Sequence, residues 1–531
     1  MKYEDIKKNA VGLFRFQLNK PSNSIKDKEI KKLVIEHKGL KFRLIVDGLL
    51  TGLIAGLFSI FYRYILFYAG NLRHFAISNI NASTILIFVP VLFVLAFVVK
   101  KALDIAPYSS GSGIPQVEGE LLGLFDINPQ KTVLSKIIGG TAANLAGQSL
   151  GREGPSIQIS AMVAKYLAKL LHRSKIEEKY MISSGAAAGL AAAFNAPISA
   201  ILFSLEEVHK SFNPYLVLPA MLAAIIADLC SKFCFGLNPI FSFAIETSIP
   251  LKSYPLIVLI GLVVSIIGIC FSKSLLFFQK IFKRLTLPKY VKILLPFLTC
   301  IPVALFLPEI MGGGHHLIDE ILTKNSSFLF ILILLFTKLL FTAFCYGSSV
   351  QGGIFLPLLV IGALSGLCVN RSLGLIFSTD IYAANYMVLG MAAIMSVVVR
   401  APLLSIILVS EMTGSFNHFL SLSLVVFIAH ILAEAIHLPP IYEAFLSNMK
   451  GQTTKEYSEK LLYDHKVKIT SPLVGKALYQ IDLPSQSLII SIKRDSHEIT
   501  PSGQTILEAD DDLLILTDED SLENLKKGLQ D

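Results

Sequence analysis

The stretch GREGPSIQIS (residues 151–160) places two glycines, a proline and the carboxylate of Glu153 inside an otherwise apolar part of the chain. GSGIP at 111–115 and GGIFLP at 352–357 interrupt apolar segments in the same way. In a bilayer, non-helical backbone is tolerated only where it is buried in protein or lines a water-filled cavity. If the chain crosses a bilayer, these three breaks therefore point inward to a transport path.

Composition indicates that most of the chain does lie in a bilayer. Over 531 residues the mean hydropathy is +0.62 and 16% of the residues are charged, against roughly 25% in soluble domains. A soluble protein of buried helices fits these values poorly. Five apolar runs approach the roughly 20 residues that a spanning helix needs, at Leu44–Tyr68, Ser83–Val99, Tyr254–Phe271, Phe328–Phe344 and Phe419–Ala433.

Charge divides the chain into two kinds of module. Residues 1–43 carry 12 Lys and Arg against 5 Asp and Glu, and this net +7 directly precedes the first apolar run. Basic flanks stay in the cytoplasm, so we expect a cytoplasmic N-terminal segment without a cleavable signal peptide. Residues 451–531 carry 9 Lys and Arg against 15 Asp and Glu, a net −6. The membrane flank thus explains much of the overall +8, and no nucleic-acid partner is expected.

A pair of segments repeats across the two halves of the membrane part. NAPISAILFSLEE at 195–207 and RAPLLSIILVSEM at 400–412 both open on Ala-Pro, 42 and 45 residues after the prolines of GREGP and GGIFLP. In each, the ninth residue after the proline is a glutamate, Glu206 or Glu411, which we interpret as an acid at a helix end. Matching interruptions predict an inverted repeat, with halves at about 44–245 and 250–446 and a site between them.

No metal and no cofactor is expected. The six cysteines lie in or beside apolar runs and form no CxxC pair, so we interpret them as small apolar side chains. The segment GGGHHLIDE at 312–320 contains His315, His316, Asp319 and Glu320, but its histidines match no standard ligand spacing, and a Gly-rich connector is the better interpretation. An intramembrane enzyme is not expected either, and the chain has no HExxH motif.

The three breaks suit an anion. Helix N-termini offer unpaired N–H groups and the positive end of the helix dipole, which compensate an anion for its lost hydration. Glycines let the backbone approach the ion, and Ser112 adds a hydroxyl donor. Glu153 lies in such a turn, where its carboxylate would compete with an anion. Because protonation of Glu153 would release it, proton and anion occupancy become linked.

The motifs GSGIP, GREGP and GGIFLP, followed by Tyr442 in PPIYEAFL, resemble the CLC family of chloride channels and proton-coupled chloride antiporters over residues 40–446. The resemblance implies an all-α polytopic membrane protein with an inverted internal repeat and broken helices. It also implies that the hydroxyls of Ser112 and Tyr442, with the backbone N–H groups of Ile354 and Phe355, bind the central anion.

The same resemblance implies that Glu153 is the external gate and that Glu207, in FSLEEVH, is the inward glutamate that passes protons onward. Channel members commonly lack this inner glutamate, so proton-coupled chloride antiport is favoured over a passive chloride channel, which stays the alternative. Nitrate-preferring members tend to have proline where this chain has Ser112, so chloride is expected. We also expect a homodimer with one pore per subunit in the plasma membrane, with both termini cytoplasmic and a bacterial source.

Past the membrane part, a linker is expected at 447–466 and a small cytoplasmic α+β lobe at 467–531. Short strands are expected at 487–492 and 513–516, a turn at 502–503 and a closing helix at 521–529. The pattern VGKALYQIDLP, SLIISIKR and ITPSGQTILEADDDLLIL resembles the C-terminal lobe of RCK (TrkA-C) regulatory domains, with Ala509 in place of the usual glycine.

This second resemblance implies a dimerising lobe that binds a small nucleotide such as cyclic di-AMP. A passive assembly lobe is the alternative. The lobe also suggests a potassium transport protein, but the membrane part contains no TVGYG-like carbonyl filter and its breaks present N–H groups, which suit anions.

Overall fold

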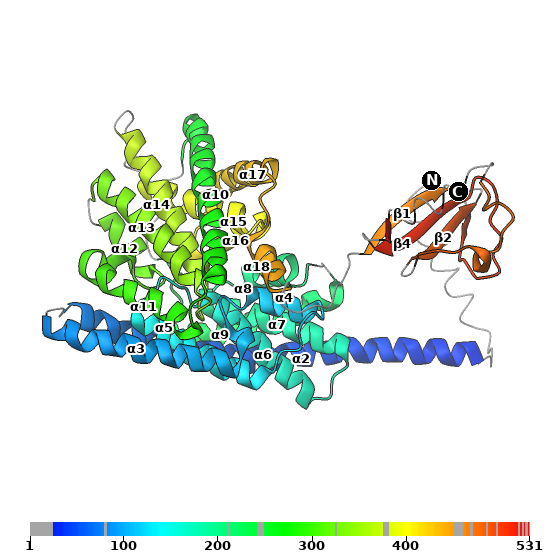
Figure 1. Ribbon diagram of the computed structural model, residues 1–531, viewed down its shortest axis with the longest axis horizontal. Helices are drawn as coiled ribbons and strands as arrows, with labels where there is room; N and C mark the ends of the chain where they lie inside the picture. Colours follow the sequence, from blue (N-terminus) through cyan, green and yellow to red (C-terminus); the bar gives the residue numbers. More distant parts are fainter. Residues whose placement is uncertain are drawn as a thin grey trace, which may run out of the picture. The chain divides into compact units, whose positions relative to one another are not determined.

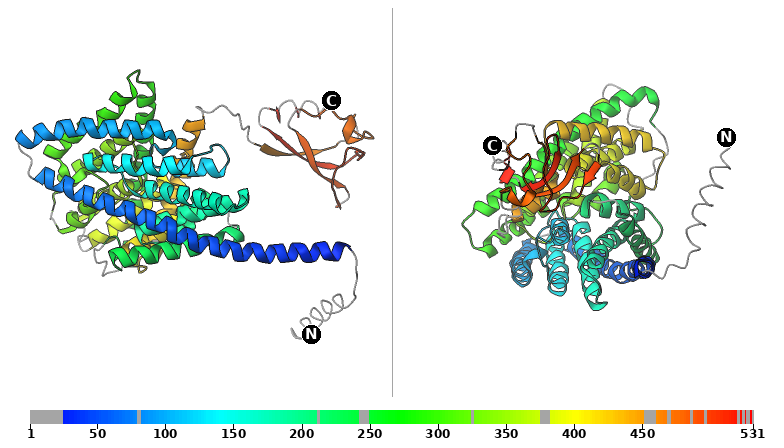
Figure 2. Two further views of the ribbon diagram at one scale, coloured as in Figure 1. Left: turned by 90° about the horizontal axis from the view of Figure 1, so that it is seen from below. Right: turned by 90° about the vertical axis from the view of Figure 1, so that its right-hand side faces the viewer.

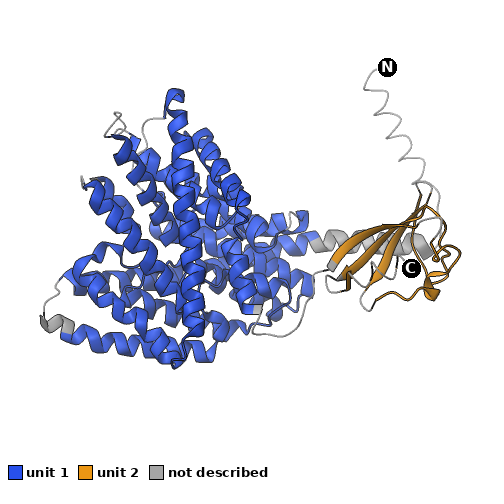
Figure 3. Ribbon diagram, turned by 45° about the horizontal axis from the view of Figure 1, so that its top comes forward, with its two compact units in different colours: residues 1–449 blue, residues 450–531 orange. Residues whose placement is uncertain are grey.

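The computed structural model divides the chain into two compact units, Met1–Met449 and Lys450–Asp531 (Figure 3). It describes residues 25–78, 82–210, 213–241, 249–323, 326–374, 382–450, 460–467, 471–484, 487–494, 497–518, 521, 522, 525 and 529. Helices build the first unit, and the second contains a four-stranded sheet. The expected all-α membrane part with a small α+β lobe is confirmed.

The first half of the membrane unit begins with one long helix, α2 (Ile25–Ser78), which both Figure 1 and Figure 2 show in blue as a continuous element. Local chemistry sets several of the helix starts that follow. Asn128 and Asn213 each accept an N–H bond from the first turn of a helix that opens on proline. The remaining elements of this half are α3 (Ala82–Ile105), α4 (Ile114–Leu121), α5 (Pro129–Ala146), α6 (Glu153–Leu170), α7 (Lys175–Phe194), α8 (Pro197–Phe203), the π-helical turn η2 (Ser204–Val208) and α9 (Pro214–Phe235).

The second half covers the other side of the membrane unit, drawn green to yellow in Figure 1. Its helices α14 and α15 pack against each other as α6 and α7 do in the first half. The elements are α10 (Tyr254–Arg284), α11 (Lys289–Phe306), α12 (His315–Thr323), α13 (Phe328–Gly347), α14 (Phe355–Gly374), α15 (Ala383–Val398), α16 (Pro402–Thr413), α17 (Phe419–Ala435) and α18 (Ile441–Lys450).

Seven helices among the described residues are long and apolar enough to cross a bilayer, and α15, α16 and α17 are shorter apolar helices. Their burial differs in a way that locates the centre of the unit. In the most apolar window of α14, 89% of the residues are buried inside the protein, against 28% in that of α3. Helix α14 is therefore a core helix, whereas α3 lies at the surface of the unit. The protein is a multi-pass membrane protein.

Two short helices display the two-fold relation between the halves. At the end of α16, the carboxylate of Glu411 accepts hydrogen bonds from the N–H groups of Ile198 (3.1 Å) and Ser199 (2.8 Å), at the start of α8. Just past the end of α8, Glu206 accepts one from the N–H of Leu404 (3.1 Å), at the start of α16. The two helices thus run antiparallel and cap each other. The interpretation of these glutamates as helix-end acids agrees with these contacts.

The lobe is an antiparallel sheet in the order β1-β4-β2-β3. Its strands are β1 (Lys460–Lys466), β2 (Leu488–Arg494), β3 (His497–Ile499) and β4 (Asp512–Asp518). One face carries the core, which includes Ile489, Ile492, Leu513 and Ile515. Of the closing helix expected at 521–529, the described residues 521, 522, 525 and 529 are helical.

The linker expected at 447–466 is wrong at both ends. Helix α18 continues to Lys450, and β1 occupies Lys460–Lys466, where it pairs with β4. Strand β1 lies at the edge of the sheet and alternates between half-buried and exposed residues. Such a strand lacks the apolar density that identified the central strands in the sequence.

Candidate functional site

The three breaks predicted from the sequence meet in space. The N–H of Gly151 donates to the carbonyl of Gly353 (2.6 Å), and the N–H of Gly353 donates back to Gly151 (2.8 Å). The N–H of Gly352 donates to the carbonyl of Gly111 (2.9 Å). The helices that begin after these breaks are α4, α6 and α14. Helix N-termini from both halves of the repeat therefore gather at one place.

Glycine is required in the first break. Gly111 and Gly113 have φ angles of +57° and +97°, in the left-handed region that favours glycine. A side chain at Gly113 would also place its Cβ 2.6 Å from the Cβ of Gln158. Any larger residue would push the loop away from α6 and separate the helix starts.

Two buried lysines hold the loops that precede α4 and α12. The ammonium of Lys136 donates to the carbonyls of Ser109 (2.9 Å) and Gly111 (2.7 Å). In the second half, Lys338 donates in the same manner to Ile310 (2.8 Å) and Gly312 (2.7 Å). Each lysine binds the negative ends of its loop's peptide dipoles, which leaves the N–H ends for the other side of the loop.

The second of these loops is the segment GGGHHLIDE, expected to be a connector. Gly312 and Gly314 have φ angles of +63° and +90°, close to those of Gly111 and Gly113. The segment is therefore the second-half counterpart of GSGIP. His315 lies 3.3 Å from the carboxylate of Asp319. Among the described residues, no three His, Cys, Asp or Glu side chains are grouped so that they could hold a metal ion.

Glu153 lies at the junction of the loops with 1% of its surface exposed. Its carboxylate lies close to its own backbone N–H, at the start of α6, and to that of Leu356, at the start of α14, and both N–H groups stabilise its charge. The guanidinium of Arg152 is 3.9 Å away. The Oε2 atom has no hydrogen-bond partner among the described residues. A negative group thus lies beside the N–H groups of two helix ends, one from each half.

Ser112 and the two tyrosines border the same place. Ser112 is buried, and a Cβ added at Gly154, directly after Glu153, would lie 3.0 Å from its Oγ. The hydroxyl of Tyr346 lies close to the backbone of Ser112, and a Cβ added at Gly111 would lie 3.2 Å from it. Tyr442 is fully buried, and its hydroxyl has no hydrogen-bond partner in the described part of the chain. The ring of Phe445 lies between the two tyrosines. Its centroid is 4.8 Å from that of the Tyr346 ring and 6.4 Å from that of the Tyr442 ring.

Ile354 and Phe355 are both fully buried at the start of α14. The Phe355 ring packs 5.3 Å from that of Phe194, at the end of α7. The first N–H groups of a helix have no partner within it. The unpaired N–H groups of α14 therefore lie near the carboxylate of Glu153, which is close to the N–H of Leu356.

A second cluster of carboxylates lies around Glu207, which is in η2. The ammonium of Lys210 lies 2.6 Å from the carboxylate of Glu118 in α4 and 2.5 Å from that of Glu443 in α18. Burial opposes the charged form of Lys210, but these hydrogen bonds outweigh it and raise its pKa above the ordinary value for lysine. Glu206 is engaged at the start of α16.

Glu207 differs from these neighbours. It is buried with 5% of its surface exposed, and its Oε1 has no hydrogen-bond partner among the described residues. Both Glu207 and Glu153 are close enough to Tyr442 for electrostatic interaction with it. The structure therefore brings Ser112, Glu153 and the start of α14 together, with Tyr442 between this group and Glu207.

The sequence did not identify Lys136, Lys210 or Tyr346 as parts of the site. A buried lysine in an apolar helix was the only signal for Lys136, because intramembrane charges are rarely without function. Lys210 and Tyr346 reach the site only through contacts with distant segments. Tyr346 does precede the GGIFLP motif by a few residues, but nothing in its local pattern marked it.

Comparison with known families gives two matches. The family model described as "Voltage gated chloride channel" matches residues 91–434, and the TrkA-C domain model matches residues 462–529. Among curated proteins, the "H(+)/Cl(-) exchange transporter ClcA" of Salmonella typhimurium is 29% identical over 451 residues, which cover 81% of this chain and 94% of the relative. The protein of the same name from Citrobacter koseri is 29% identical over 433 residues, 78% of this chain and 91% of its own length.

Solved structures agree with this fold. A slow cyanobacterial Cl−/H+ antiporter superposes with a TM-score of 0.70 at 27% identity and covers 78% of this chain and 99% of its own. A eukaryotic CLC transporter superposes with a TM-score of 0.67 at 17% identity, covering 92% of this chain and 89% of its own. At that identity the second likeness concerns the fold alone.

Proposed function

This chain belongs to the voltage gated chloride channel family and carries a C-terminal TrkA-C lobe, and we propose that it exchanges chloride for protons across the membrane. The curated relatives are named H+/Cl− exchange transporters, and a structural neighbour at 27% identity is titled a Cl−/H+ antiporter. A passive chloride channel is the alternative that the experiments below separate from exchange.

One observation carries the proposal: the carboxylate of Glu153 lies close to backbone N–H groups at two helix ends that belong to opposite halves. Helix N-termini bind anions through these same groups. The carboxylate and a chloride ion would therefore compete for one place. When Glu153 is protonated it loses its charge, and its side chain can leave the place to chloride. Each chloride that enters the site is therefore linked to a proton on Glu153.

The anion would then lie against Ser112 and Tyr442. The buried Tyr442 hydroxyl, which has no hydrogen-bond partner among the described residues, supplies a donor. Ser112 stands next to Gly154, and the backbone N–H groups of Ile354 and Phe355 open α14. These donors recognise charge and size, so chloride is the expected ion and other small monovalent anions would follow.

Glu207 would pass protons on the inner side. Of the four carboxylates there, Glu118 and Glu443 bind Lys210, and Glu206 caps α16. Glu207 is the buried carboxylate of the four whose Oε1 has no hydrogen-bond partner among the described residues. An acid that is not held in a pair can gain and lose a proton without breaking a contact that supports the fold.

The central test uses purified protein in vesicles that contain high chloride, at equal pH inside and outside. Chloride leaving by exchange should draw protons inward, and the lumen should become acidic against the proton gradient that forms. Fast chloride efflux with no change in luminal pH would exclude exchange and leave the channel.

Two variants assign the glutamates. Glu153→Gln should abolish proton movement and keep chloride flux, because the neutral amide resembles the protonated acid. Glu207→Gln should also stop proton movement and spare chloride. Glu206→Gln, the same substitution one residue earlier, is the matched control and should keep both fluxes. Proton transport that persists in Glu153→Gln would remove that residue from its assigned role.

We propose further that the protein resides in the plasma membrane of a bacterium, with both termini in the cytoplasm. The basic segment before the first apolar run and the Salmonella and Citrobacter relatives support this. Labelling of a single cysteine placed at residue 455, in a variant lacking the six native cysteines, should require permeabilised cells. Labelling in intact cells would reverse the orientation.

For the lobe we propose dimerisation and binding of a small nucleotide such as cyclic di-AMP, within a homodimer that has one pore per subunit. The sheet face opposite the core supports pairing, since Leu462 and Leu488 both pair with Leu516 across the strands and are each more than 60% exposed. Cyclic di-AMP should raise the melting temperature of the full chain, and cyclic GMP at equal concentration should not. Equal responses would exclude specific recognition.

A further inference from the structure

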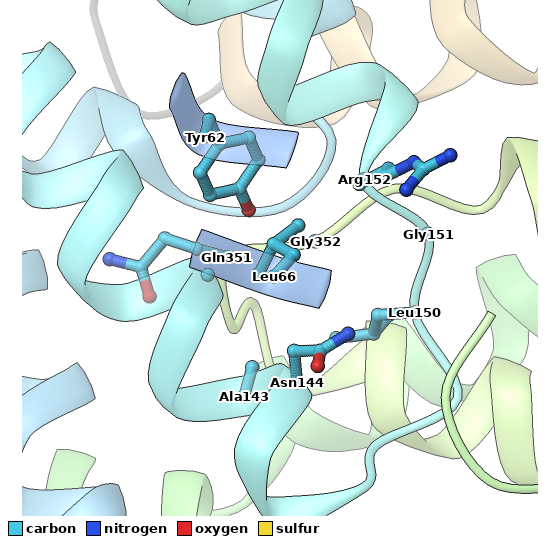
Figure 4. Close-up of a pocket in the computed structure, with 10 residues that line it drawn as sticks. Tyr62, Leu66, Ala143, Asn144, Leu150, Gly151, Arg152, Gln351 and Gly352 are labelled. Carbon is cyan, nitrogen blue, oxygen red and sulfur yellow. The ribbon is translucent and has the colours of Figure 1, made fainter. Parts of the chain in front are cut away.

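A small pocket lies beside Glu153, between α2, α5 and the loops that precede α6 and α14. Its polar lining comes from Tyr62, Asn144, Arg152 and Gln351, with glycine backbone from Gly140, Gly151 and Gly352. Figure 4 shows the Tyr62 hydroxyl turned toward the space between Gln351 and Arg152. Neither the anion contacts nor the proposed role of Glu207 uses this pocket.

Two glycines in the middle of α5 make room for the polar groups. A Cβ at Gly140 would lie 2.2 Å from the Tyr62 hydroxyl, and a Cβ at Gly139 would lie 2.4 Å from Oε1 of Gln351. Glycine in a helix interior costs roughly 1 kcal/mol relative to alanine. Two consecutive glycines therefore lower the stability of the helix. The Tyr62 hydroxyl and the Gln351 amide occupy the space that side chains at these two positions would fill.

The pocket reaches the gate. Gly151, in its lining, directly precedes Arg152 and Glu153, and a Cβ at Gly151 would lie 2.3 Å from Oε2 of Glu153. That oxygen has no hydrogen-bond partner among the described residues. Tyr62 is also close enough to Glu153 for electrostatic interaction. The unpaired oxygen of the gate thus lies beside Gly151, one of the residues that line the pocket.

Contacts along α2 indicate which way the pocket lies. Near its start, α2 meets the beginning of α7, where Arg43 pairs with Glu177 at 3.4 Å. Six residues further along α7, Ser183 is hydrogen-bonded to His209 (3.0 Å), two residues from Glu207. Tyr62 is 19 residues beyond Arg43, about 28 Å along a helix. The pocket is therefore displaced from Glu207 toward the opposite side of the membrane.

Buried polar atoms without protein partners are normally satisfied by water. Gln351 is fully buried, and its Oε1 is unpaired in the described part of the chain, as is Nε of Arg152. The space has room for about one water molecule. A water there could donate to Gln351 Oε1 and to the gate oxygen while it accepts a hydrogen bond from Tyr62 or Arg152.

We propose that this pocket binds a water molecule through which Glu153 exchanges its proton with the outer solution. The water donates one proton to the Glu153 carboxylate and takes one up from the solvent side, so it is unchanged after each transfer. Protons would then reach the gate beside the anion path and not through it. This inference rests on the proposed exchange function.

Chloride fits the pocket less well than water. The ion is larger than the single water that the space takes, and Gln351 Oε1 would place an acceptor against it. The glycine N–H groups nearby are already engaged, since Gly151 and Gly352 donate to Gly353 and Gly111. These two loop glycines thus offer an anion no free backbone N–H group.

The first test is structural. An experimental structure that resolves ordered solvent should show one water within hydrogen-bond distance of the Tyr62 hydroxyl and Gln351 Oε1. An empty pocket would overturn the proposal. So would an anomalous peak in the pocket for crystals grown in bromide, because that would identify an anion. The presence of the water is measured without any transport assay. The water can therefore be absent from a protein that exchanges chloride for protons, and it can be present in a protein that does not.

The second test compares Tyr62→Phe with Tyr64→Phe in the vesicle assay. Tyr62→Phe removes one hydrogen bond to the water and should lower the number of protons moved per chloride roughly five-fold, with chloride flux within two-fold of the parent. Tyr64 lies on the same helix, but its hydroxyl donates to the Cys234 carbonyl, so Tyr64→Phe should leave the ratio unchanged. An unchanged ratio in Tyr62→Phe would overturn the relay even if the water is present.

Discussion

The loop before α4 and the loop before α12 follow one plan but carry different side chains. Both contain two glycines with positive φ, and in both a buried lysine binds two backbone carbonyls. The first adds Ser112, which lies against the helix that starts with Glu153, whereas the second continues into His315 and His316. The repeat therefore supplies a scaffold that orients peptide dipoles in both halves, and only the first copy adds a hydroxyl, that of Ser112, beside Glu153.

Replacement of the two lysines should give the largest effects. Lys136→Met and Lys338→Met each remove two hydrogen bonds from a charged donor, worth about 1.5–3 kcal/mol apiece. We expect both variants to melt at clearly lower temperature than the parent. Only Lys136→Met should also lower chloride flux, by at least about ten-fold, because its loop contains Ser112. Melting curves and vesicle efflux measure the two effects.

Lys289→Met is the control for this pair. Lys289, at the start of α11, and its partner Asp104 are both exposed, and Asp104 keeps a second partner in Lys100. The loss of Lys289 should therefore change stability by less than about 1 kcal/mol. If Lys338→Met lowered chloride flux as much as Lys136→Met, the two loops would be functionally equivalent and the comparison would fail.

The reciprocal caps offer an intermediate test of the symmetry. The carboxylate of Glu411 accepts hydrogen bonds from two backbone N–H groups and from the hydroxyl of Ser199. The carboxylate of Glu206 accepts a hydrogen bond from the N–H of Leu404. Losing a helix cap costs about 0.5–2 kcal/mol, so Glu411→Ala should lower the melting temperature more than Glu206→Ala. Neither should alter the ratio of protons to chloride. Loss of proton transport in one variant alone would show that the copies differ in chemistry here too.

Ser112→Ala should give the smallest effect and addresses the difference between the loops most directly. One hydrogen bond of about 1 kcal/mol corresponds to roughly five-fold weaker chloride binding, measured by calorimetry on purified protein. The control is Ser365→Ala, because that hydroxyl donates to the Ile361 carbonyl within α14. Unchanged affinity in Ser112→Ala would mean that backbone dipoles alone hold the anion.

Much of the scaffold could be predicted because its signals are local. Long apolar runs, Gly/Pro interruptions and the repeated Ala-Pro segments gave the multi-pass helical unit, and Leu513–Leu516 lies within an observed strand. The edge strand β1 was missed because its alternating pattern is short and half exposed. The roles of Glu153, Glu207, Ser112, Ile354, Phe355 and Tyr442 stay predictions.

The sequence by itself determined that the chain spans a membrane, where its helices break, and which residues stand at the breaks. Glycine, proline and apolar length act on the nearest few residues, so they can be interpreted without a fold. Only the tertiary structure decided that Gly151 pairs with Gly353, that Lys136 and Lys210 hold segments distant in sequence, and that Tyr62 lies near the carboxylate of Glu153. These contacts depend on how whole helices pack, and no local pattern carries that information.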